Sequence, residues 1–136
     1  MLHKLFQIFI NELESDSTVK GYVKDRVYPQ RIAEIRSVEF PCITFYIVMP
    51  VRVGGALSTE SRFMFEIRTH AETLKEAAQI YSAMKSALAI KNFRNTNYHI
   101  VTGGMPDTPR HTIDPDSEPI TYNCYCTFEV FALRRT

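Results

Sequence analysis

Three residues in the C-terminal third of the chain have side chains suited to acid–base or cation chemistry. His111, Asp114 and Asp116 fall in one short polar stretch. An imidazole beside two carboxylates can act as a general base or contribute to a cation site. The spacing alone does not fix the geometry that catalysis needs, and a solvated polar loop is the favoured interpretation.

The three cysteines offer a second candidate site. Cys124 and Cys126 form a Cys-x-Cys pair, and alternation along a strand would turn both thiols to one face, where they could hold a soft metal. No histidine or further cysteine occurs at a familiar ligand spacing, so buried reduced thiols are the prediction for both and for Cys42. An odd number of cysteines also argues against a disulfide framework.

Motifs for a nucleophile or a phosphate loop are not found in the sequence. There is no Gly-x-Ser-x-Gly elbow. Gly54-Gly55 and Gly103-Gly104 lack the Lys-Ser/Thr partner that a phosphate loop requires, and they are interpreted as turn residues. The sequence therefore predicts no cofactor.

Three arginines form the remaining candidate group. Arg62 and Arg68 fall on the polar side of an alternating segment, and Arg52 lies nearby. Such a group could contact a protein or a phosphate, although a solvated face is the default. The chain carries 16 basic and 15 acidic residues, for a net charge of +1. It thus lacks the basic excess of a dedicated nucleic-acid binder, and the aromatic residues are predicted to be core rather than a base-stacking platform.

Length and composition predict one globular domain over residues 1–136. Hydrophobic residues make up 45% and charged residues 23%, as in ordinary soluble proteins. The apolar segment 5–10 is short, and Asn11 and Glu12 follow it directly. Neither a signal peptide nor a transmembrane helix is expected, and the prediction is a cytoplasmic protein without a membrane partner.

Three helices are predicted from apolar spacing and capping residues. The first two cover 2–14 and about 17–24, with Asp16-Ser17-Thr18 supplying the N-cap chemistry of the second. The third covers 73–90 and starts with a capping box of Thr73 and Glu76. Its predicted buried stripe comprises Leu74, Ala77, Ala78, Tyr81, Met84 and Leu88.

Strands are predicted at 41–49, 62–69, 98–101 and 120–133 from β-branched, aromatic and alternating residues. Residues 103–119 contain two glycines and four prolines, and they are predicted to form a long loop without regular structure. The predicted fold class is α+β: a mixed, mostly antiparallel sheet of about four strands, with two to three helices packed on one face.

This order of elements resembles the tail-completion family of tailed phages and prophages, which includes the tail terminators. The resemblance extends over nearly the whole chain, and Asn92 to Pro119 has no matching motif. The segments that carry it are Asp16–Val19, Asp25–Pro29, Pro41–Phe45, Phe63–Thr69 and Thr73–Ala77, the last within the helix that ends near Leu88.

The resemblance implies a structural protein and no enzymatic activity. It implies a homo-oligomer, commonly a hexameric ring, that caps the tail tube and joins it to the head connector. DNA would pass through the lumen without specific binding. The protein would be in the bacterial host cytoplasm during assembly and later in the tail or neck of the virion.

Loops position recognition residues on a packed scaffold. The loops at about 50–61 and 103–119 are therefore the expected contacts with neighbouring subunits or the tube. The candidate assembly residues are Arg52, Gly54, Gly55, Arg62, Arg68, His111, Asp114 and Asp116.

Three alternatives stay open at this point. One is a head-closure or neck adaptor protein, which differs from a terminator in the partner that it binds. Another is a small enzyme that uses His111, Asp114 and Asp116. The third is a nucleic-acid-binding module that uses Arg52, Arg62 and Arg68, and it would show a steep salt dependence.

Overall fold

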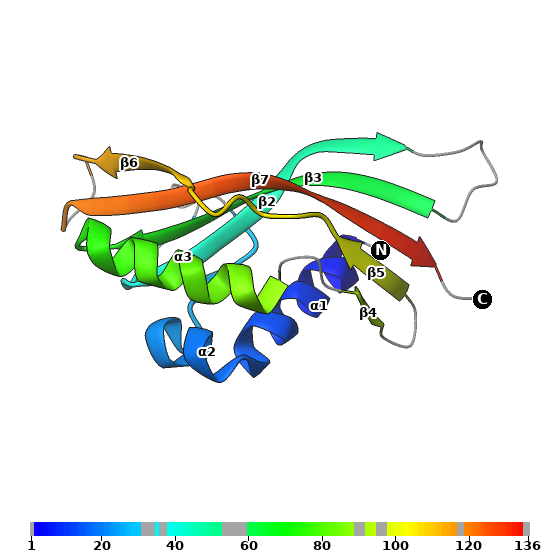
Figure 1. Cartoon of the computed structure of the whole chain (residues 1–136), viewed down its shortest axis with the longest axis horizontal. Helices are drawn as coiled ribbons and strands as arrows, with labels where there is room; N and C mark the ends of the chain where they lie inside the picture. The colour runs from blue at the N-terminus through cyan, green and yellow to red at the C-terminus, as the bar shows by residue number, and fades with distance from the viewer. Residues whose placement is uncertain are drawn as a thin grey trace.

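A computed structural model describes residues 2–30, 35, 38–52, 60–88, 92–94, 98–116 and 119–134. Within these ranges, helices pack on one face of a long twisted sheet (Figure 1). The helices are α1 (Leu2–Ser15), α2 (Ser17–Val23) and α3 (Leu74–Leu88). The strands are β1 (Val27–Tyr28), β2 (Cys42–Arg52), β3 (Glu60–Ala71), β4 (Asn92–Arg94), β5 (Tyr98–Thr102), β6 (Arg110–Asp114) and β7 (Thr121–Arg134).

The sheet has the order β1-β2-β3-β7-β5-β4, and β6 also pairs with β7. The long strands β2, β3 and β7 are antiparallel neighbours, whereas β1 runs parallel to β2. Because β3 occupies one edge of β7, the strands β5 and β6 share the other edge. β5 pairs near the C-terminal end of β7, and β6 pairs with Thr121–Tyr125. The predicted α+β class with a mixed, mostly antiparallel sheet is confirmed.

The predicted number of about four strands is wrong, since the described residues form seven. Strands β1 and β4 have only two and three residues, too few to produce a recognisable alternation. The prediction that 103–119 has no regular structure is also wrong. Strand β6 forms inside that glycine- and proline-rich stretch because it pairs with the first part of β7.

The predicted N-cap of α2 is confirmed, and of the capping box predicted before α3 the structure gives the bond between the Glu76 amide and Thr73. The Asp16 carboxylate accepts hydrogen bonds from the amides of Thr18 and Val19, at 3.1 and 3.0 Å, and so begins α2. The Thr73 hydroxyl accepts a hydrogen bond from the Glu76 amide at 3.2 Å, directly before α3. These side chains satisfy amides that have no partner within their own helix.

The core lies between the helices and the facing side of the sheet, and aromatic rings dominate its centre. Phe65 of β3 has ring centroids 5.0 Å from Phe9 of α1 and 5.9 Å from Phe128 of β7. Phe45 of β2 lies 6.1 Å from Phe65. The alternation predicted for the segment 62–69 is confirmed, because Phe63, Phe65 and Ile67 are all buried.

The predicted buried stripe of α3 needs one correction. Met84 is fully buried, but Leu74 is 40% exposed. The buried positions of this helix are Ala77, Ile80, Tyr81, Met84, Ala87 and Leu88. The stripe is therefore rotated toward Ile80 and away from Leu74, which occupies the first position of the helix.

Candidate assembly surface

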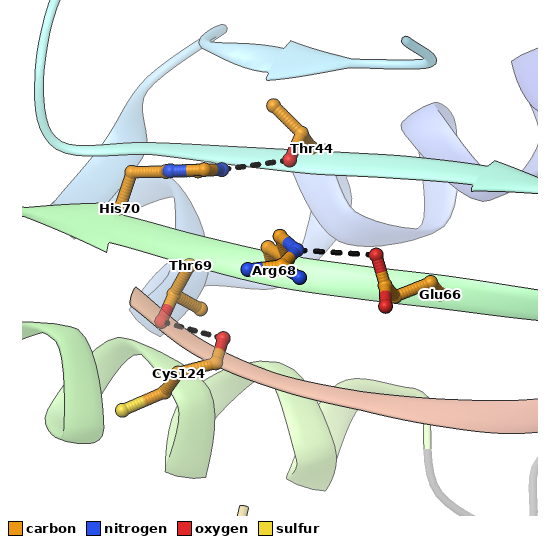
Figure 2. A network of polar contacts seen from close by, with 6 residues as sticks. All are labelled: Thr44, Glu66, Arg68, Thr69, His70 and Cys124. Atoms are coloured by element: carbon orange, nitrogen blue, oxygen red, sulfur yellow. Dashed lines mark hydrogen bonds and ion pairs between the residues drawn. The ribbon is translucent and has the colours of Figure 1, made fainter. Parts of the chain in front are cut away.

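The face of the sheet opposite the helices, called the outer face below, carries Arg62 and Arg68, two of the three arginines that the sequence singled out. Arg68 extends between β3 and β7, with its guanidinium carbon 4.0 Å from the Tyr125 ring centroid. Its Nε donates to the Glu66 carboxylate at 3.1 Å (Figure 2). The side chains of Arg68 and Glu66 are 24% and 14% exposed. Arg68 is thus held by a ring and a carboxylate of its own chain.

Arg62 has a similar arrangement at the other end of β3. It forms an ion pair with Glu129, and its guanidinium carbon lies 5.5 Å from the Phe131 ring centroid. Its Nε is buried and has no hydrogen-bond partner among the described residues. Both outer-face arginines are therefore paired with carboxylates, which weakens their attraction for phosphate.

The structure brings only some of the predicted assembly residues together. Arg62 and Arg68 share the outer face but are six residues apart on β3, a separation of about 20 Å along the strand. Arg52 ends β2, where it pairs with Ser61, so its backbone lies beside Arg62 rather than Arg68. Gly54 and Gly55 lie outside the described residues.

The predicted trio of His111, Asp114 and Asp116 does not form one site. His111 and Asp114 are three positions apart on β6, so their side chains leave opposite faces of the strand. The amide of Asp116 donates to the Asp114 carboxylate at 3.2 Å, which closes a turn. The described residues contain no group of three His, Cys, Asp or Glu side chains arranged to hold a metal ion.

The segment that leads into β6 is attached to α3. Tyr81 donates a hydrogen bond to the Pro106 carbonyl at 2.7 Å, Lys85 pairs with Asp107, and Met105 is buried. Between this segment and the edge of β7 lies an open cavity of about 310 Å³. Its lining residues are Glu66, Pro106, Thr108, Arg110, Tyr125, Cys126 and Thr127. Pro106 and Asp107 of the predicted loop are thus attached to α3.

A buried polar cluster on the outer face was not predicted. Thr44 of β2 and His70 of β3 are hydrogen-bonded, with Oγ1 and Nε2 2.7 Å apart (Figure 2). Asn123 of β7 is the cross-strand partner of His70. All three residues are buried, and the Asn123 carbonyl oxygen has no hydrogen-bond partner among the described residues. Burial lowers the pKa of His70 to about 4, so the imidazole is neutral at pH 7.

Local sequence patterns contain little indication of this cluster, because its members lie on the same side of their strands as partly exposed residues. His70 is two positions from Arg68, which is partly exposed. Only the closeness of a histidine to the end of a predicted strand could have drawn attention to it.

All three thiols are buried, as predicted. Burial raises the pKa of Cys42 to about 12 and also raises the pKa values of Cys124 and Cys126. Cys124 and Cys126 do share the helix-facing side of β7. There the Thr69 hydroxyl links the layers by donating to the Ala77 carbonyl at 2.9 Å and lying 3.4 Å from the Cys124 carbonyl (Figure 2). The pair is part of the core.

Within the described ranges, every helix is too short or too polar to cross a membrane. No protein-family model matches the chain, and no curated protein sequence matches it. A solved structure titled "Virion of native gene transfer agent (GTA) particle" contains a similar chain, with a TM-score of 0.62 and 13% sequence identity. The match covers 93% of this chain and 90% of that chain, so the two share the same fold.

Proposed function

We propose that this chain is a structural protein of a tailed-phage-like particle, which completes the tail tube and joins it to the head connector. The observation that carries the proposal is the fold shared with a chain of a gene transfer agent virion. That match covers 93% of this chain, so it extends over most of the arrangement of helices and strands. The order of elements, which resembles the tail-completion family, supports the same role.

In this proposal the chain forms a hexameric ring in the host cytoplasm and then becomes part of the virion. A tail end must let DNA pass, and tight DNA binding would hinder passage. The ion pairs of Arg62 with Glu129 and of Arg68 with Glu66 favour this arrangement, because they compensate positive charge on the outer face. The near-neutral net charge of +1 is in keeping with it.

The ring is tested by the native mass of the purified chain over a concentration series, measured by sedimentation equilibrium. Six copies of 15.7 kDa give a species of about 94 kDa. A species of this mass supports a preformed ring. A monomer at every concentration would exclude a ring that forms in solution. The proposal would then require that the ring assembles on the tail tube.

The tail-end role is tested by mixing the chain with purified tail tubes and with purified head connectors of the particle encoded with it. Co-sedimentation with tubes, and added density at one tube end in electron micrographs, are expected. Binding to connectors alone would instead identify a head-closure or neck adaptor protein. Binding to neither would overturn the structural role.

The nucleic-acid alternative is tested with a fluorescent DNA duplex. Fluorescence anisotropy at about 20 mM and 200 mM salt should show negligible binding at both, since the outer-face arginines are paired. Strong binding at low salt with a steep decrease at high salt would favour a nucleic-acid-binding module.

A further inference from the structure

The open cavity beside β7 lies where one edge of that strand is uncovered. Strand β5 pairs with β7 as far as Val130, and β6 begins to pair with it at Tyr125. Between them, the Gly103 amide donates to the Glu129 carbonyl at 2.7 Å. The chain then leaves the edge and returns to it at Arg110. A short stretch of β7 therefore has no neighbouring strand on this edge.

Thr127 directs its backbone amide and carbonyl into this gap. The Glu129 carbonyl points toward β5, and the backbone groups of alternate residues in a strand point to the same edge. The backbone groups of Thr127, two residues earlier, therefore point away from β3 and toward the cavity that Thr127 lines. Among the described residues, neither group has a backbone hydrogen-bond partner on this edge. The cavity thus contains one donor and one acceptor of a strand edge, which an extended peptide can satisfy.

The charged side chains around the cavity include one cation without a carboxylate partner. Glu66 lines the cavity but pairs with Arg68 at 3.1 Å. Asp107, next to two lining residues, pairs with Lys85. Arg110 also lines the cavity, and within the described ranges it forms no ion pair. Because the nearby carboxylates are already paired, Arg110 leaves the cavity with a positive charge that favours an acidic ligand.

The walls of the cavity are fixed and suited to a small polar ligand. Arg110 and Tyr125 are cross-strand partners, so their side chains are neighbours on one side of the sheet. The guanidinium carbon of Arg68 lies 4.0 Å from the Tyr125 ring centroid and holds this ring from the β3 side. Thr108 and Thr127 are exposed and add hydroxyl groups. The volume of about 310 Å³ is at the lower end of the roughly 300–1,000 Å³ range of ligand pockets, which suits a short peptide.

We propose that this cavity binds a short extended segment of a partner protein through the backbone of the segment and one acidic side chain. The segment hydrogen-bonds to the amide and carbonyl of Thr127, and its carboxylate pairs with Arg110. A phosphate group fits less well, because its higher negative charge is repelled by the Glu66 carboxylate in the lining. The proposal goes beyond the tail-end role and does not depend on it, since it rests on the edge of β7 and on the charges beside it.

The test uses the synthetic peptide Ac-Thr-Glu-Thr-NH2 and its neutral match Ac-Thr-Gln-Thr-NH2, in which threonine favours an extended backbone. Saturation-transfer difference NMR with the full chain measures both dissociation constants, whether the chain is a monomer or a ring. Because charge-assisted hydrogen bonds are stronger than neutral ones, the acidic peptide should bind about fivefold or more tightly, in the millimolar range. No saturable binding of the acidic peptide up to about 20 mM overturns the proposal.

The role of Arg110 is tested with Arg110→Gln, and Lys75→Gln is the matched control. Lys75 is an exposed cation of α3 that does not line the cavity. Arg110→Gln should weaken binding of the acidic peptide about fivefold or more and change that of the neutral peptide less than about twofold, whereas the control keeps the acidic preference. Circular dichroism with denaturant titration checks that both variants are folded. An acidic preference that persists in Arg110→Gln overturns the proposal.

Two small ions separate the contribution of the backbone from that of the charge. Acetate has a carboxylate but no peptide group, so it should bind about tenfold or more weakly than the acidic peptide in a competition titration. Equal affinity for acetate would mean that the edge of β7 contributes nothing, and it overturns binding of an extended segment. Inorganic phosphate that displaces the peptide at concentrations below the dissociation constant of the peptide would identify a phosphate site and also overturns the proposal.

Binding to tail tubes and connectors is a separate measurement, so the two proposals can fail independently. A chain that binds the acidic peptide but neither tubes nor connectors supports the peptide site and overturns the proposed function. A chain that binds tubes but shows no saturable binding of the peptide supports the proposed function and overturns the peptide site.

Discussion

The two faces of the sheet are built from the same strands, yet burial follows residue type on only one of them. Under the helices, most residues are apolar and buried, with Phe65 at the centre, and the buried Thr69 and Thr102 donate to backbone carbonyls. On the outer face, the polar residues Thr44 and His70 are buried at one end, whereas Phe131 is 42% exposed at the other. The comparison teaches that residue type determines burial only where another layer covers the strand.

The largest expected effect separates two phenylalanines. Phe65→Ala removes a fully buried ring from the aromatic core and should lower the free energy of unfolding by about 3–5 kcal/mol. Phe131→Ala removes a ring that is 42% exposed and should cost less than about 1 kcal/mol. Urea unfolding at low protein concentration measures both. Equal losses would show that the outer face is packed as a second core, contrary to the comparison.

A smaller expected effect compares two positions of α3. Met84→Ala should cost about 2–5 kcal/mol because Met84 is fully buried against the sheet. Leu74→Ala is the matched control and should cost less than about 1 kcal/mol, since Leu74 is 40% exposed. Urea unfolding measures the free energy of both variants. A larger loss for Leu74 than for Met84 would contradict the rotated stripe of this helix.

The buried polar end of the outer face should make stability depend on pH. Burial holds the pKa of His70 at about 4, below its ordinary value of 6.5; the neighbouring Asn123 side chain raises this pKa, Arg68 lowers it further, and Asp114 raises it. The unfolded chain therefore binds a proton at pH values where the folded chain does not. The contribution of neutral His70 to the free energy of unfolding is complete above pH 6.5. It decreases as the pH falls toward 4, with a total loss of about 3 kcal/mol.

This prediction is measured by urea unfolding at several values between pH 7 and pH 4. Carboxylates also titrate near the lower end, so the wild type is compared with a His70→Asn variant. The difference in free energy between the two proteins should shrink as the pH falls. A difference that stays constant over this range would mean that His70 has the same pKa in the folded and the unfolded chain and is not desolvated.

Local sequence patterns predicted the helix caps and the alternation of the strands. They did not predict features that depend on strand pairing or on whether another layer covers a strand. The N-cap of Asp16 and the alternation around Phe65 depend on neighbouring residues and were predicted. Strand β6 depends on β7, which lies later in the chain, and its glycine- and proline-rich surroundings indicated a loop. The burial of Thr44 and His70 depends on contacts between separate strands, which no single segment reveals.

The candidate site shows the same division. The alternation of β3 correctly assigned Arg62 and Arg68 to the outer face, but their carboxylate partners Glu129 and Glu66 were not predicted. Glu129 belongs to another strand, so its pairing with Arg62 required the register between β3 and β7. The exposure of Phe131 and of Ile113 was not predicted either: Phe131 lies in the predicted strand 120–133, whose alternation does not show which residues another layer covers, and Ile113 lies in the predicted loop 103–119.

The smallest expected effect distinguishes the two arginines of the outer face. In Arg68→Lys, the ammonium cannot reproduce both the stacking on Tyr125 at 4.0 Å and the directed bond to Glu66. The expected loss is about 1 kcal/mol, reduced by solvent because the Arg68 side chain is 24% exposed.

Arg62→Lys is the matched control at the exposed apolar end, where the ring of Phe131 is 5.5 Å away and the Arg62 side chain is 37% exposed. Its loss should be below about 0.5 kcal/mol and should shrink further in 1 M salt, as expected for a screened surface pair. A loss for Arg62 that equals that of Arg68 and persists in salt would mean that the exposed end is already ordered in the isolated chain. The contrast between the two ends of the outer face would then lie only in the apolar residues and not in how firmly the charged residues are held.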